Sequence, residues 1–327
     1  MVGPGLDEER GTQEMSAALG TTDPAVHRRR LRTELRNARE AAGMTQRDVA
    51  KAMDWSQSKL IRIESGVVNI STNDLRALLS YYEVDSSRIE ALVEVARAAR
   101  ETTRWSIYRD VASPEFLAFL GYESSASIVR NFEPFFVPGL LQTEEYARTV
   151  ISIIAADSHK VDPLVDLRME RQELLVRDPP ADLHFIMDEA VIRRVTGGRD
   201  IMRRQLRHLQ KLIDENPNIT VRIIPFQQGN YRRQHVSYWL FEFPNPADEY
   251  LLYLENPLGD YITRETSAEE EDKESPASYL ETFFELEQIV SREVTLNLLR
   301  DAISRLMDEL PPATSGSEAS GGSSPRT

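Results

Sequence analysis

Residues Leu35–Gly66 read LRNAREAAGMTQRDVAKAMDWSQSKLIRIESG and decide the fold of the N-terminal part of the chain. Thr45 and Ser56 are good N-caps, and each precedes a short run of apolar residues at helical spacing. About three residues separate the two predicted helices. Asp54 lies in that turn, where a left-handed backbone is often needed. With the small Ala50 near the middle of the first helix, this pattern predicts a helix-turn-helix.

Apolar residues at helical spacing predict further helices on both sides of this stretch. One runs through Leu31 and Leu35, and two later ones open near Ser71 and Ser86. The side chains expected in the core around the turn are Trp55, Leu60, Ile61 and Ile63. The sequence therefore predicts an all-α N-terminal domain of about five helices, spanning residues 26–100.

The distribution of charge also sets the N-terminal helical region apart from the rest of the chain. The whole sequence of 327 residues has 39 Lys and Arg against 53 Asp and Glu, a net charge of −14. Between Arg28 and Arg62, however, ten basic residues face four acidic ones, a net charge of +6. A basic segment on an acidic protein is typical of a polyanion-binding module. An Arg-rich helix face that only keeps the domain in solution explains the charge equally well.

Residues 28–97 resemble the XRE (Cro/repressor-type) helix-turn-helix domain, through the A-G-x-T-Q and R-I-E-x-G strings. The resemblance implies a recognition helix from Ser56 to Arg62 in the major groove of double-stranded DNA. The DNA-binding residues that it implies are Gln46, Arg47, Ser56, Gln57, Ser58, Lys59 and Arg62. It also implies a structural pair, Arg39 with Glu64, that clamps the recognition helix. We expect the run Arg28-Arg29-Arg30 to add salt-dependent attraction to phosphates.

Residues 101–309 mix helical and strand-like patterns. Strands are expected at 182–187, 219–224, 236–243 and 250–255, with a further one at 261–264, because these runs are short and rich in β-branched or aromatic residues. Residues 126–132 are expected to form a helix. The pattern predicts a larger α+β domain with a four- to five-stranded sheet covered by helices.

The second region also carries a resemblance. FEPFFVPGLLQTEEYA, DEAVIRRVTGG, RRQLRHLQKL and NITVRIIPF, in this order behind a helix-turn-helix, are similar to the WhiJ-like, antitoxin-like regulators. That family implies a regulatory domain that dimerises and responds to a small ligand or to a small companion protein encoded nearby. The chain departs from the family pattern near residues 260–275, and the acidic stretch 267–275 within it is expected to be an exposed loop.

Chemistry-bearing motifs are sparse. The chain has no cysteine, which excludes disulfides and thiolate metal sites, and no two histidines have metal-ligand spacing. We therefore expect no enzyme activity, no cofactor and no metal. A ligand or partner pocket between sheet and helices is one interpretation of five polar residues beside apolar runs; a solvated edge is the other. These residues are Glu123, Arg130, Gln142, Glu189 and Glu255.

Both ends are expected to be disordered, as an arm over residues 1–25 and a Pro/Gly/Ser tail over 310–327. No secretory signal or membrane-spanning run is present in the sequence, so we expect a cytoplasmic protein. The predicted function is sequence-specific transcriptional regulation by a homodimer on a near-palindromic operator. The alternative is an antitoxin-like protein that mainly captures a small partner, with autoregulatory DNA binding.

Overall fold

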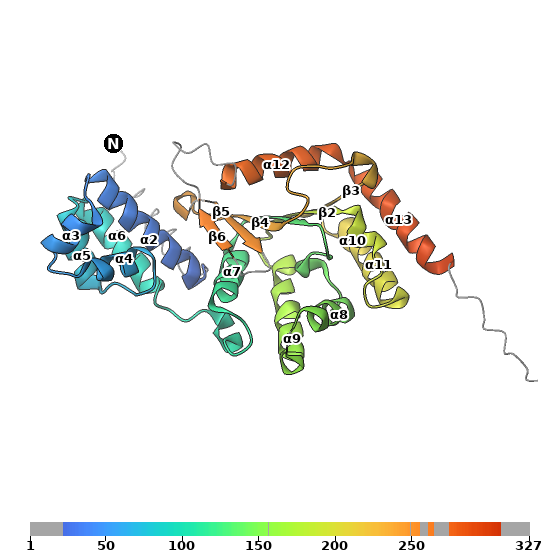
Figure 1. The fold of residues 1–327 in the computed structure, drawn as a ribbon, viewed down its shortest axis with the longest axis horizontal. Coiled ribbons are helices and arrows are strands. Elements are labelled where there is room, and N and C mark those ends of the chain that lie inside the picture. Colours follow the sequence, from blue (N-terminus) through green and yellow to red (C-terminus); the bar gives the residue numbers. More distant parts are fainter. Residues whose placement is uncertain (1–21, 156, 249, 256–260, 265–274, 309–327) are drawn as a thin grey trace, which may run out of the picture.

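The computed structural model of the chain describes residues 22–155, 157–248, 250–255, 261–264 and 275–308, and its helices and strands are named as in Figure 1. Most of the expected N-terminal arm (1–21), most of the acidic loop (267–274) and the tail (310–327) lie outside these residues. No helix in the described part of the chain is long and apolar enough to cross a membrane.

Five helices form the N-terminal domain, as predicted. They are α2 (Pro24–Ala41), α3 (Gln46–Ala52), α4 (Gln57–Glu64), α5 (Thr72–Tyr81) and α6 (Ser86–Ala98). Their apolar faces meet in one core, which includes Leu35, Val49 and Leu60. The expected boundary at residue 25 falls inside α2, because Asp23 caps this helix and Pro24 supplies its first residue.

The C-terminal domain is an α+β fold. Its helices are α7 (Pro114–Ser125), α8 (Glu144–Ile154), α9 (Val161–Arg171), α10 (Glu189–Arg193), α11 (Arg199–Glu215), α12 (Pro276–Ile289) and α13 (Arg292–Asp308). Its strands are β1 (Ile128–Glu133), β2 (Asp182–Asp188), β3 (Ile219–Ile224), β4 (Ser237–Glu242), β5 (Leu251–Glu255) and β6 (Tyr261–Arg264). Short 3-10 turns join them, among them Arg104–Tyr108, Gln172–Val176 and Pro246–Asp248.

The six strands form one mixed sheet in the order β3-β2-β1-β4-β5-β6, one strand more than the larger number expected. β1, β2 and β3 are parallel, whereas β4 and β5 are antiparallel to their neighbours. The expected helix at residues 126–132 is wrong, because α7 ends at Ser125 and residues 128–133 form the central strand β1. β1 reads IVRNFE, in which Ile128, Val129 and Phe132 have helical spacing and no apolar–polar alternation marks a strand.

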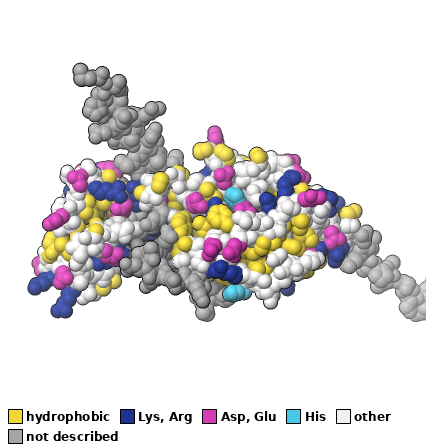
Figure 2. Space-filling model, turned by 90° about the horizontal axis from the view of Figure 1, so that it is seen from above, with side chains coloured by type: hydrophobic (Ala, Val, Ile, Leu, Met, Phe, Trp, Pro, Cys, Tyr) yellow, Lys and Arg dark blue, Asp and Glu magenta, His cyan; other side chains and the backbone are white. Residues whose placement is uncertain are grey.

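Helices cover both faces of the sheet (Figure 1). The larger core lies on the face that packs against α7, α8, α9 and α11, with Val129, Phe185 and Phe241 at its centre. On the opposite face, Phe132, Tyr238 and Phe283 pack in a smaller core beneath α12. Figure 2, seen from the α12 side, shows apolar side chains over this part of the molecule and protruding basic side chains at the end formed by the N-terminal helices.

Candidate nucleic-acid interface

The turn between α3 and α4 has the geometry that the sequence predicts. Asp54 has φ +54°, in the left-handed region, so the chain reverses directly after α3. The amide of Trp55 donates to the carbonyl of Ala50 at 2.8 Å, which closes the end of α3. The Ser56 hydroxyl then accepts from the Lys59 amide at 3.1 Å and caps α4. The hydroxyl of Ser56 is therefore engaged in capping, although Ser56 itself is exposed.

One side of α4 is open to solvent. Gln57, Ser58, Ile61 and Arg62 are exposed, whereas the helix buries its other side through Leu60 and two later residues. Because exposed positions recur at i, i+1, i+4 and i+5, they lie on one face of the helix. The expectation that Ile61 belongs to the core is wrong: its side chain is 43% exposed and lies between the polar side chains of this face. Half-buried Trp55 only flanks the core.

Lys59 differs from the other members of the implied DNA-binding set. Its Nζ lies 3.2 Å from a carboxylate oxygen of Asp74 on α5 and 3.8 Å from the centre of the Trp55 ring. A DNA phosphate or base would have to compete with both partners for this ammonium group. Arg47, on the first turn of α3, is exposed.

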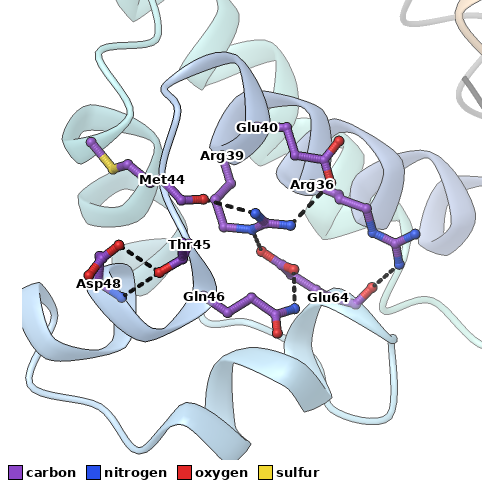
Figure 3. Close-up of polar contacts among 8 residues, drawn as sticks. All are labelled: Arg36, Arg39, Glu40, Met44, Thr45, Gln46, Asp48 and Glu64. Carbon is purple, nitrogen blue, oxygen red and sulfur yellow. Dashed lines mark hydrogen bonds and ion pairs between the residues drawn. The ribbon is translucent and has the colours of Figure 1, made fainter. Parts of the chain in front are cut away.

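Glu64, the last residue of α4, joins three parts of the domain (Figure 3). Its carboxylate is 2% exposed and accepts from Arg39 Nε of α2 at 2.7 Å and from Gln46 Nε2 of α3 at 2.8 Å. Arg39 also donates to the carbonyl of Met44 at 2.9 Å. Burial opposes the charge of Arg39, but the hydrogen bond and the charge of Glu64 outweigh it and raise the pKa of Arg39. The implied clamp is thus present, and Gln46 belongs to it.

The arginines at the start of α2 are not on the DNA-binding surface. Arg29 and Arg30 are 6% and 7% exposed, and both contact Asp248 in the C-terminal domain. Arg28 donates to the carbonyl of Ala99 at 3.1 Å. The expectation that this run attracts phosphates is wrong for Arg29 and Arg30, because the first half of α2 packs against the other domain and its guanidinium groups are used there.

Three of the five polar residues proposed to line a C-terminal pocket, Glu123, Gln142 and Glu255, lie around Arg168 and Arg171 of α9, whereas Arg130 and Glu189 lie elsewhere. Arg130 lies against α12, where it pairs with Glu242 and stacks on the Phe284 ring. Glu123 and Gln142 lie on the opposite face, where Glu123 makes two 2.8 Å bonds to Arg171.

Of the other two members, only Glu189 lies apart from this group. Glu189 accepts from Arg193 and from the amide of Phe226, both at 2.8 Å. Glu255 is exposed at the end of β5. Within the described residues, the structure therefore brings Glu123, Gln142 and Glu255 near one pair of arginines and gives Arg130 and Glu189 surroundings of their own.

The polar cluster beside Gln142 also contains three residues that the sequence did not single out, Glu133, Arg168 and Ser237. Arg168 of α9 donates to Gln142 Oε1 at 2.8 Å. Ser237 of β4 pairs in register with Glu255 of β5, and its hydroxyl donates to Glu133 at the end of β1 at 2.7 Å. Burial raises the pKa of Glu133 to about 8 and lowers that of Arg168 to about 10. Only the pairing of three distant strands brings these residues into one place.

Two family models match the chain. One, described as a helix-turn-helix domain, matches residues 30–92 and so covers the N-terminal helices described above. The other, described as a domain of unknown function (DUF5753), matches residues 116–283, just over half of the 327 residues. No curated protein matches the chain, and no solved structure does.

Proposed function

The chain belongs to the DUF5753 family and carries a helix-turn-helix domain, and from this premise we propose that it is a sequence-specific, double-stranded-DNA-binding transcriptional regulator of the XRE type, with no enzyme activity. The observation that carries the proposal is the exposed face of α4, formed by Gln57, Ser58, Ile61 and Arg62. Four side chains on one unpaired helix face, next to a buried clamp that fixes the helix, suit insertion into a groove of DNA.

The chemistry of this face matches base edges. A Gln amide can bind adenine N6 and N7 together, and an Arg guanidinium can bind guanine O6 and N7. An apolar side chain such as Ile61 suits the methyl group of thymine. Exposed Arg47 and Lys51 on α3 are placed for phosphate contacts, which fix the register of the protein on DNA but do not read sequence.

We further propose that the protein acts in the cytoplasm as a homodimer on a near-palindromic operator. A single helix-turn-helix buries too little surface for specific control at physiological salt, and a two-fold axis doubles the contacts. Recognition helices on neighbouring half-sites then lie about 34 Å apart, one turn of DNA. The WhiJ-like C-terminal domain would supply dimerisation and the response to a small ligand or companion protein.

The test uses the full chain, because the start of α2 is part of the C-terminal core and a cut at residue 100 would damage both domains. Binding sites are selected from random duplex DNA, and affinities are measured over a salt series. Gln57→Ala and Arg62→Ala should each weaken the selected site by about 1–3 kcal/mol more than random DNA. Arg47→Ala should weaken both DNAs equally and reduce the salt dependence.

Three outcomes separate the possibilities. Loss of discrimination in the α4 variants alone supports base reading by this face. Equal losses on selected and random DNA would assign Gln57 and Arg62 to the backbone and leave the base-reading residues elsewhere. No selected site at all, together with a small protein that co-purifies with the chain, would favour the antitoxin-like alternative.

A further inference from the structure

Helix α2 belongs to two hydrophobic cores at once. Ala25 and Val26, at its start, are 2% and 0% exposed and pack in the larger core of the C-terminal domain. Leu31 and Leu35, about one and a half to two and a half turns later, are part of the N-terminal core. Figure 1 shows the helix leading from the N-terminal domain towards α7. Eighteen residues of helix, about 27 Å long, thus connect the domains without a hinge between the two cores.

Asp23, the N-cap of α2, fixes the start of the helix on the C-terminal domain. Its carboxylate accepts from the Thr103 hydroxyl at 2.5 Å, and its amide donates to the Ser125 hydroxyl of α7 at 2.8 Å. Gly121 of α7 lets the two helices approach this closely. A Cβ at Gly121 would lie 2.4 Å from Asp23 Oδ1 and 2.9 Å from the Cβ of Ala25. Any larger residue at 121 must therefore push α2 away.

One turn further along, Arg29 and Arg30 tie α2 to the loop between β4 and β5. Arg29 donates to the carbonyl of Asp248 and, at 3.1 Å, to that of Tyr250. The Nε of Arg30 lies 3.8 Å from the Asp248 carboxylate, which is only 5% exposed. We call the contacts of Asp23, Arg29 and Arg30 with the C-terminal domain the α2 junction. Arg29, Arg30 and Asp248 are buried, so salt and water screen their contacts little.

We propose that the α2 junction sets the half-site spacing that the regulator accepts, with Gly121 and Arg29 as positioning residues. This inference rests on the proposed function, in which C-terminal domains hold two DNA-binding domains in a dimer. If each DNA-binding domain were attached only through residues 99–103, it could turn on that linker and reach half-sites at several spacings. Fixed by α2, the two recognition helices have one separation and one orientation.

The first test compares spacings. Two copies of the half-site selected by the wild-type chain are placed at every spacing across about one helical turn of DNA. The variants are Gly121→Ala, which displaces α2, and Arg29→Met, which removes two hydrogen bonds but keeps an apolar stem. Arg76→Gln is the matched control, because it breaks an Arg–carboxylate pair with Glu90 that lies wholly within the N-terminal domain.

Wild type and Arg76→Gln should prefer one spacing about tenfold over those half a turn away, because a misplaced second half-site contributes nothing. In Gly121→Ala and Arg29→Met the preference should fall to about twofold, while affinity for a single half-site stays within about twofold of wild type. Variants that keep the wild-type preference would overturn the proposal, and so would a wild-type chain that accepts all spacings equally.

A second measurement needs no DNA. Because the chain has no cysteine, Ser80→Cys on α5 and Asn297→Cys on α13, both exposed, allow two spin labels to be attached specifically. Their distance distribution should be narrow in the wild-type background and at least about twice as broad with Gly121→Ala, as expected when a fixed domain becomes tethered. A broad wild-type distribution would refute the junction as a fixed contact. Failure to select any half-site, with a narrow distribution, would instead refute the proposed function.

Discussion

Glu64 shows how much of the DNA-binding domain depends on a single buried carboxylate. It accepts from one side chain of α2 and one of α3 while ending α4, so it fixes the recognition helix against both. Removing one partner of a buried ion pair leaves the other as an unpaired charge, which costs more than the pair itself gains. We therefore expect Glu64 to affect DNA binding through the position of α4 and not through contact with DNA.

We predict that Glu64→Ala lowers the free energy of unfolding by about 3 kcal/mol, because Arg39 loses its buried partner. Thermal unfolding measures the change, and affinity for the selected DNA should fall with it. Glu40→Ala is the control: Glu40 contacts the same Arg39 at 3.2 Å but is exposed, so the expected loss is below about 0.5 kcal/mol. Equal melting of Glu64→Ala and wild type would contradict the clamp.

At the scale of the elements, the α3–α4 turn depends on one strained residue. Asp54 adopts φ +54°, which costs most residues about 1–2 kcal/mol and glycine very little. Asp tolerates this region better than most side chains, so the turn forms without glycine. The angle between α3 and α4, and hence the presentation of the exposed face of α4, depends on this conformation.

We predict that Asp54→Gly raises the free energy of unfolding by up to about 1 kcal/mol, since relief of strain exceeds the extra entropy of the unfolded chain. Asp54→Val should lower it, because a β-branched residue fits this region worst. Chemical denaturation of the three chains gives the order. A glycine variant less stable than the valine variant would mean that strain at residue 54 does not control the turn.

For the whole molecule, the cluster around Glu133 joins α9 and the turn before α8 to the ends of β1, β4 and β5. Burial raises the pKa of Glu133 to about 8, so the folded protein holds a proton that the unfolded chain releases near pH 4.5. Between these values the folded state binds more protons than the unfolded state. Stability must then fall as pH rises through this window, and the loss is complete above about pH 8.

Glu133→Gln should remove this dependence, because an amide does not ionise and can still accept from the Ser237 hydroxyl. The free energy of unfolding of wild type should fall relative to that of the variant as pH rises. We expect this difference to change by roughly 3–5 kcal/mol between pH 4.5 and pH 9. Denaturant unfolding at several pH values measures the difference. Parallel curves for the two proteins would show that Glu133 is ionised in the folded state at neutral pH.

Local sequence patterns are enough to predict most helices and strands of the fold. N-caps, a turn residue and apolar periodicity predict the helix-turn-helix, and short β-branched runs predict five strands. The error at β1 arises because this central strand buries Arg130, Asn131 and Glu133 among its apolar residues, so its sequence lacks the apolar–polar alternation of a half-buried strand. The assignment of Ile61 to the core fails for a related reason: hydrophobicity gives its preference for burial, but its angular position on α4 places it on the exposed face.

The sequence by itself determined what short segments need: the caps, the left-handed turn, the strands and the charges of the DNA-binding helices. Only the tertiary structure decided which charged side chains are exposed and which are buried in contacts within the protein. Arg29 and Arg30 look like phosphate ligands in a list of basic residues, yet α2 buries them against a loop more than two hundred positions away. Likewise, Glu133, Ser237 and Glu255 meet only through strand register. Such pairings depend on contacts between distant segments, which local propensity and composition do not encode.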